Sequence, residues 1–310
     1  QIWVDEASMN VKVLDIPVWQ ETSVGYPLEL RMRFSNFAET RGAGVPQPFG
    51  QGWSCQWQSH IAVEATNSNR IWMWMSSGSI VLFTNSVGNP NGYYPPPSVD
   101  GWLERVDSTL YKYRKSDDQT WRYTYADWAG SQVYLLTEMK DAWENKVSVS
   151  YLSNRLYRVE QTVPASGRRL EFMYGTNGLA STVSTVGRTG AVRSATFGYW
   201  NGMLTGVIDM AGHGYGYSYF DSQYIATAAD ATISYTSPPC LCVSTNWFEI
   251  DLRWPDEAGK TNRTTYQWNY LKPGYNDTYI LKTTVRGGQS TTEELQLDNL
   301  IFTPSGRKWV

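Results

Sequence analysis

Four short segments between residues 121 and 220 end in tyrosine and decide the fold: VSVSY (147–151), LEFMY (170–174), TFGY (196–199) and YGYSY (215–219). A turn pair follows each segment: NR (154–155), NG (177–178), NG (201–202) and DS (221–222). With one earlier tyrosine, the series recurs every 20 to 26 residues: Tyr125, Tyr151, Tyr174, Tyr199 and Tyr219. A period of this length indicates one supersecondary unit stacked many times, here a β-hairpin. We therefore assign the five tyrosines a structural role.

The flanking sequence has the same β character. LELRMRF (28–34) alternates apolar and charged residues, which indicates a strand with one buried face. RIWMWM (70–75) and IVLF (80–83) predict a hairpin, whereas NPNGYYPPP (89–97) is predicted to be a long loop. Further strands are predicted after the tyrosine series, at 247–254, 264–270, 279–285 and 295–302.

These patterns predict an all-β fold. Tandem β-hairpins are expected to pair into a curved, spiralling antiparallel sheet that forms a partial wall or a small barrel. We divide the chain into a lead-in at 1–120, the tyrosine hairpins at 121–222 and further hairpins at 223–310. An open sheet edge exposes backbone hydrogen-bonding groups, so we expect self-association or covering by another chain.

The composition bears on the class of protein. The 310 residues include 15 Trp and 21 Tyr with only 18% charged residues, which is not a disordered composition. A net charge of −3 provides no basic field for phosphates, so we do not expect a nucleic-acid partner. The sequence contains no run of about 18 apolar residues, so we predict no transmembrane segment. No signal peptide is visible, so we expect Gln1 to follow a removed leader or to lie inside a longer chain.

Residues of the types used in metal or nucleophilic sites are few. His60 and His213 have no accompanying catalytic motif, and with Cys240 and Cys242 they give no recognised zinc spacing. We therefore predict no metal and no other cofactor. Together with Cys55 the cysteines are too few for a disulfide scaffold, and whether any two of them pair stays open.

Carboxylates and tryptophans leave two further alternatives. Glu249 and Asp251 share one strand face about 7 Å apart, a separation that a glycosidase could use and that a solvated strand face also explains. Four tryptophans could stack on sugar rings in a trough, or could belong to the sheet core: Trp72, Trp74, Trp247 and Trp254.

Several of these motifs resemble the Rhs/YD-repeat family. Tyr125-Ala-Asp127, NRL (154–156) and LTGVID (204–209) match parts of its tyrosine–aspartate repeat. Upstream motifs follow the order of the segment that opens the repeat wall in bacterial members: DIPV (15–18), FGQGW (49–53), SGSIVLF (77–83), YYPPP (93–97) and LYKY (110–113). The resemblance covers about residues 11–220.

The resemblance implies a shell-like wall. Such walls occur in bacterial polymorphic toxins, in the C-component of insecticidal toxin complexes and in teneurins. It implies a non-catalytic, secreted or cell-surface module that encapsulates or scaffolds, alone or within a larger chain. The self-cleavage signature Asp-Pro-x-x-Gly of the family toxins is absent from this sequence. A surface adhesin or glycan-binding module is the alternative, and a glycoside-acting enzyme is a third.

Overall fold

The computed structural model describes residues 1–5, 10–20, 25–35, 47–75, 79–86, 88–128, 131–220, 224–228, 231–235, 247–255, 261–269, 278–286, 289–297, 300–303 and 306–309. These residues form β-strands almost throughout, with one short 3-10 helix, η1 (Gln56–Gln58). The chain folds as two compact units. The larger unit is Leu14–Gly214, and the smaller unit combines Gln1–Val13 with Tyr215–Val310.

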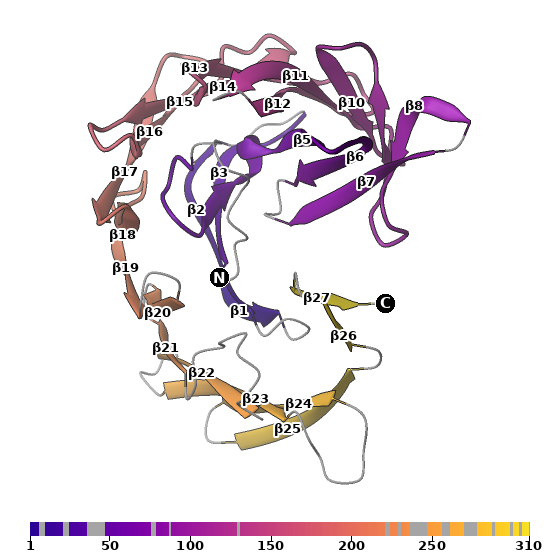
Figure 1. The fold of residues 1–310 in the computed structure, drawn as a ribbon. Coiled ribbons are helices and arrows are strands. Elements are labelled where there is room, and N and C mark those ends of the chain that lie inside the picture. Colours follow the sequence, from indigo (N-terminus) through magenta and orange to yellow (C-terminus); the bar gives the residue numbers. More distant parts are fainter. Residues whose placement is uncertain are drawn as a thin grey trace. The chain divides into compact units, whose positions relative to one another are not determined.

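Eight consecutive strands of the larger unit close into an antiparallel barrel (Figure 1): β5 (His60–Glu64), β6 (Asn67–Trp74), β7 (Ile80–Ser86), β8 (Asn89–Tyr94), β9 (Trp102–Arg105), β10 (Leu110–Arg114), β11 (Thr120–Trp128) and β12 (Ser131–Lys140). Each strand pairs with the next one in the chain. Residues 133–135 of β12 pair back with β5 and close the ring. Closure removes the open edges that an eight-stranded sheet would otherwise have.

Aromatic rings fill the barrel. Alternation along each strand turns every second side chain inward, and these inward positions are buried: Ile61, Ile71, Met73, Phe83, Tyr93, Leu103, Tyr111, Tyr113, Trp121 and Tyr123. The rings meet edge to face, with centroids 4.7 Å apart for Tyr111 and Tyr134 and 5.9 Å apart for Phe83 and Tyr113. Edge-to-face contacts of this kind add stability beyond that of the buried area.

The sheet continues out of the barrel from β12. Residues 138–140 pair with the first of six further strands: β13 (Lys146–Leu152), β14 (Arg155–Val163), β15 (Arg169–Tyr174), β16 (Ala180–Val186), β17 (Val192–Trp200) and β18 (Met203–Ile208). We call these six strands the hairpin sheet. One of its faces is buried and mostly aliphatic, with Val149, Leu170 and Val183 at 3% exposure or less.

The residues described between Leu14 and Gln58, which we call the covering segment, lie against this buried face. They comprise most of β2 (Asn10–Gln20), then β3 (Leu28–Ser35), β4 (Trp53–Cys55) and η1. Figure 1 shows β3 inside the curve of the hairpin sheet. The backbone N–H of Ala180 donates to the carbonyl of Pro48 at 2.7 Å, and the rings of Phe49 and Phe197 lie 5.1 Å apart.

The smaller unit is a further run of antiparallel strands. Its strands are β1 (Ile2–Asp5), which pairs with β2, and β19 (Gly214–Phe220), β20 (Tyr224–Ala228), β21 (Ala231–Tyr235), β22 (Trp247–Pro255), β23 (Thr261–Asn269), β24 (Thr278–Arg286) and β25 (Gln289–Leu297), each paired with the next. A separate hairpin joins β26 (Leu300–Thr303) to β27 (Gly306–Trp309). Ile233, Ile250 and Leu252 form part of its core.

The structure confirms the predicted all-β class, with hairpins paired into a curved antiparallel sheet. The alternation at residues 28–34 is confirmed, because all four of its apolar side chains are at 2% exposure or less. The loop predicted at 89–97 is wrong in its first half, which forms β8. Pro90 is tolerated there because the pairing of β7 with β8 is irregular between Asn85 and Ser86, where the missing N–H breaks no regular ladder.

Candidate functional site

Four of the five repeated tyrosines follow a β-bulge. The pairing register shifts by one residue immediately before Tyr151, Tyr174 and Tyr199, and in the smaller unit before Tyr219. In every case the second strand of the hairpin carries the extra residue. A bulge bends its strand and re-aims the adjacent side chain. The tyrosine repeat of the sequence is therefore a repeat of one local backbone distortion.

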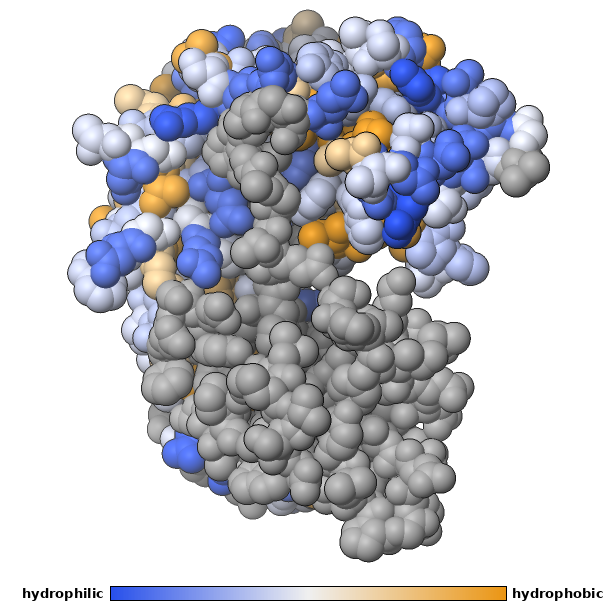
Figure 2. All heavy atoms as spheres, in the orientation of Figure 1, coloured by the Kyte–Doolittle hydropathy of each residue, from blue (hydrophilic) through white to orange (hydrophobic). Residues whose placement is uncertain are grey.

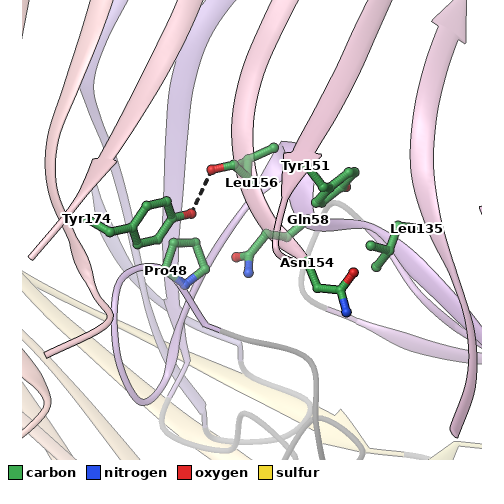
Figure 3. Close-up of a pocket in the computed structure, with 7 residues that line it drawn as sticks. All are labelled: Pro48, Gln58, Leu135, Tyr151, Asn154, Leu156 and Tyr174. Atoms are coloured by element: carbon green, nitrogen blue, oxygen red, sulfur yellow. Dashed lines mark hydrogen bonds between the residues drawn. The ribbon is translucent and has the colours of Figure 1, made fainter. Parts of the chain in front are cut away.

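Two of these tyrosines donate a hydrogen bond from their hydroxyl group to the preceding hairpin. Tyr174 donates to the carbonyl of Leu156 at 2.8 Å, drawn as a dashed line in Figure 3. Tyr199 donates to the carbonyl of Ala180 at 2.7 Å. Both carbonyls lie near the start of the second strand of the preceding hairpin. Tyr151 instead donates to the carbonyl of Trp57 in η1, at 3.4 Å.

The turns between the strands explain the asparagines of the repeat. Ser153 and Asn154 have φ values of 49° and 61°, and Asn201 and Gly202 have 49° and 77°. Two successive left-handed residues are the requirement of the type I′ turn, which matches the twist of the flanking strands. The first turn lies one residue earlier than the NR pair of the sequence.

Tyr125 differs from the other members of the series. It is 41% exposed, and its ring lies edge to face with that of Tyr134 at 5.6 Å. The bulge of the hairpin formed by β11 and β12 precedes Tyr123 instead. Tyr123 is fully buried and shares a 2.8 Å hydrogen bond with the hydroxyl of Ser59. Tyr125 shares the alternation of Trp121 and Tyr123 along β11, so this sequence pattern does not identify which ring is buried.

A small pocket opens beside the tyrosine bonds. It is lined by side chains from the covering segment, β12 and the first hairpins, as Figure 3 shows: Pro48, Gln58, Leu135, Tyr151, Asn154, Leu156 and Tyr174. It has room for about one water molecule. Burial raises the pKa of Tyr151 and of Tyr174, so both hydroxyls stay protonated and act as hydrogen-bond donors at neutral pH. The pocket therefore suits a structural water better than a substrate.

The four tryptophans named from the sequence have different surroundings. Trp74 is 8% exposed and its ring stacks on that of His60 at 4.5 Å, so its face is not open to a sugar. Trp72 is half-buried, with the Arg70 guanidinium 5.8 Å above its ring. In the smaller unit Trp254 is half-buried near the end of β22. Trp247 begins β22, and its side chain lies outside the described residues.

Neither histidine stands in a catalytic arrangement in the described part of the chain. His60 is buried in its stack with Trp74, and its Nδ1 lies 3.2 Å from the carbonyl of Gln58. His213 is exposed at a turn, where its Nδ1 lies 3.2 Å from the carboxylate of Asp209. The same carboxylate accepts the backbone N–H of His213, so this contact belongs to the turn.

The predicted carboxylate pair is described at one member only. Asp251 is 5% exposed, and its two oxygens accept hydrogen bonds from Arg253 at 2.7 and 2.9 Å and from Arg263 at 2.9 Å. The expectation of a solvated strand face is thus wrong at Asp251, because two guanidinium groups replace water around it. The side chain of Glu249 lies outside the described residues, as do Cys240 and Cys242, while Cys55 is buried on β4.

Among the residues that the structure describes, no three His, Cys, Asp or Glu side chains are grouped as metal ligands would be. No helix in the described part of the chain has the length and apolar character needed to cross a membrane. No protein-family model matches the chain, and no curated protein matches it either.

Proposed function

We propose that the chain is a non-catalytic, extracellular structural module, a wall of the YD-repeat type that scaffolds or encloses other parts of a secreted assembly. The observation that supports this most is the repeated tyrosine unit. A bulge and a hydroxyl-to-carbonyl bond to the preceding hairpin recur at Tyr174 and Tyr199. Left-handed residues recur in the turns that follow these tyrosines, at Gly178 and Asn201. Each repeat adds strands of the same structure to the sheet. A wall requires this property.

The outer surface of the larger unit supports the expectation of a partner. Six apolar side chains on or beside the hairpin sheet are more than half exposed: Trp143, Leu152, Met173, Val192, Trp200 and Ile208. Figure 2 shows apolar residues scattered among hydrophilic ones on one face of the larger unit. Covering of these side chains by a second copy, or by another part of the same assembly, would remove their apolar surface from water.

Light scattering after size-exclusion chromatography tests this proposal. We expect a mass above the 35.2 kDa of one chain, from self-association or from a stable complex with another chain of the same assembly. Met173→Glu and Ile208→Glu should lower the measured mass, because each places a charge in the covered surface. Thr205→Glu, on the same sheet at a site that is already polar, is the matched control. A strictly monomeric particle, both alone and in the presence of the other chains of the assembly, would contradict the proposal.

A further inference from the structure

Two exposed aromatic side chains belong to neighbouring strands, β8 and β9, on the outer wall of the barrel. In the pairing of β8 with β9, Gly92 lies opposite Glu104 and Tyr93 lies opposite Leu103. Tyr94 and Trp102 are the next residues of the two strands after this last pair. Tyr93 and Leu103 are buried inside the barrel, so their neighbours point outward. Tyr94 is 44% and Trp102 39% exposed, values that a ring in the core would not have.

The Tyr94 ring lies back along the sheet over a glycine. A Cβ atom added at Gly92 would stand 3.3 Å from Cε2 of Tyr94 and 2.5 Å from the side-chain nitrogen of Asn89. Only glycine leaves this space for the ring. The Tyr94 ring therefore lies near Gly92, on the outer face of the barrel.

The loop that joins the two rings is held in place before any ligand arrives. Within it the N–H of Val99 donates to the carbonyl of Pro96 at 3.0 Å. Asp100 accepts hydrogen bonds from the hydroxyl of Tyr113 and, at 3.3 Å, from the N–H of Ser116. A site whose backbone is fixed in advance loses less conformational entropy on binding.

An ion pair lies on the same outer face as the two rings. Glu104 pairs in register with Gly92, and Arg114 pairs with Trp102. The Arg114 Nε donates to the Glu104 carboxylate at 2.8 Å, and each side chain is about two-fifths exposed. Both charges remain accessible beside the rings, and they cancel. Donors and acceptors of this kind suit hydroxyl groups, whereas a strongly anionic ligand would gain little from them.

We infer that Tyr94, Trp102 and the Glu104–Arg114 pair form a binding site for a neutral pyranose glycan. A pyranose with equatorial hydroxyls has an apolar C–H face, which packs on aromatic rings, and a polar rim, which reaches the ion pair. Neighbouring strands are about 4.8 Å apart, so the two rings together offer a platform the width of a sugar ring. This inference does not rest on the proposed wall function, since the site uses the barrel and not the hairpin sheet.

Calorimetric titration with soluble neutral oligosaccharides, namely cello-, laminari- and chito-oligosaccharides, tests the inference. We expect one of them to bind, and Trp102→Ala and Tyr94→Ala each to weaken that binding about tenfold or more. Arg114→Met should weaken it by a smaller factor, because it removes a donor and leaves the rings in place.

Trp143→Ala is the matched control, because Trp143 is 82% exposed on the turn after β12 and lies outside the platform. Its glycan affinity should equal that of the unchanged protein, and circular dichroism should show that all variants keep the fold. Three results would overturn the inference: no binding to any of the three glycans, binding that survives Trp102→Ala, or an equal loss in Trp143→Ala. Binding of a proline-rich peptide at these rings in place of any glycan would overturn it as well.

Discussion

The barrel and the hairpin sheet are built from the same antiparallel hairpins, but they bury their inner faces differently. The barrel closes on itself through β5 and β12 and fills its interior with its own rings, among them Phe83 and Tyr113. The hairpin sheet has a mostly aliphatic inner face and is covered by a segment from far upstream. Tyr199 reaches the carbonyl of Pro48 across 151 positions of the chain.

This difference shows which contacts each region depends on. The strands of the barrel lie within one continuous stretch, 60–140. The hairpin sheet has local hydroxyl-to-carbonyl bonds between its hairpins, but its inner face is buried only when the covering segment is in place. Long-range contacts form late, because the loop between them must first be closed. We therefore expect substitutions in the barrel and in the hairpin sheet to differ in the contacts that they remove as well as in the size of the loss of stability.

Alkaline pH should have the largest effect, and the buried tyrosines of the barrel should contribute to it. Burial, with smaller contributions from Asp100 and Asp117, raises the pKa of Tyr113 to about 12, and burial also raises the pKa of Tyr111 and of Tyr123. Their pKa in the unfolded chain is about 10. Because the folded pKa is the higher one, the stabilisation by protonated Tyr113 is complete below about pH 10 and is lost as the pH rises to about 12.

Circular dichroism combined with ultraviolet absorbance of tyrosinate would follow this transition. We expect unfolding and the ionisation of the buried tyrosines to occur together. Ionisation of every tyrosine near pH 10 with an unchanged dichroism spectrum would show that the barrel interior is open to water.

Phe83→Ala should have the next largest effect. Phe83 is fully buried against Tyr113, and removing its ring leaves a cavity in a closed interior. We expect the free energy of unfolding to fall by about 3–5 kcal/mol. Urea denaturation measures this loss, and Phe83→Leu, which retains most of the volume, should cost less. Equal losses for both variants would indicate that ring shape matters more than filled volume.

Gly50→Ala tests whether the covering segment is needed by the hairpin sheet. Gly50 has φ +83°, and an added Cβ atom would stand 2.2 Å from the carbonyl oxygen of Gly202. Gly202→Ala is a close control, because its φ is +77° and nothing lies within 4 Å of its added Cβ atom. The left-handed conformation costs each variant about 1 kcal/mol, and Gly50→Ala should lose more. Hydrogen exchange should show the additional loss in β17 and β18, and equal losses would remove the role given to the covering segment.

The sequence was most informative where the structure is periodic. Alternation at residues 28–34 and the asparagine-containing turns follow local rules, so the hairpins could be predicted from short windows. Three features could not. Closure of the barrel depends on a pairing between β5 and β12, which lie far apart in the chain. The burial of Trp74 depends on His60. Tyr123 and Tyr125 lie two residues apart on β11 and so share one face, and the burial of Tyr123 rather than Tyr125 depends on its contact with Ser59.

The rings of the proposed glycan site could not be identified from the sequence either. Trp72 and Trp74 lie in a tryptophan-rich strand, and this composition suggested that their rings stack on sugar rings. Tyr94 and Trp102 lie in and after a proline-rich stretch that the sequence indicates as a loop. Their placement on neighbouring strands comes from the pairing of β8 with β9, and no local pattern encodes a pairing across the seven-residue loop 95–101.

Tyr174→Phe should have the smallest effect and examines the bond between hairpins directly. The substitution keeps the ring, over which the Arg155 guanidinium lies at 5.5 Å, and removes only the hydroxyl that donates to Leu156. We expect a loss of about 0.5–1.5 kcal/mol in urea denaturation, the usual net value of one such bond. Tyr125→Phe, at the exposed member of the series, should change stability by less than about 0.5 kcal/mol. If the two variants lost equal stability, the hydroxyl-to-carbonyl bond of Tyr174 would add nothing to the stability of the hairpin sheet, and the covering segment alone would account for its order.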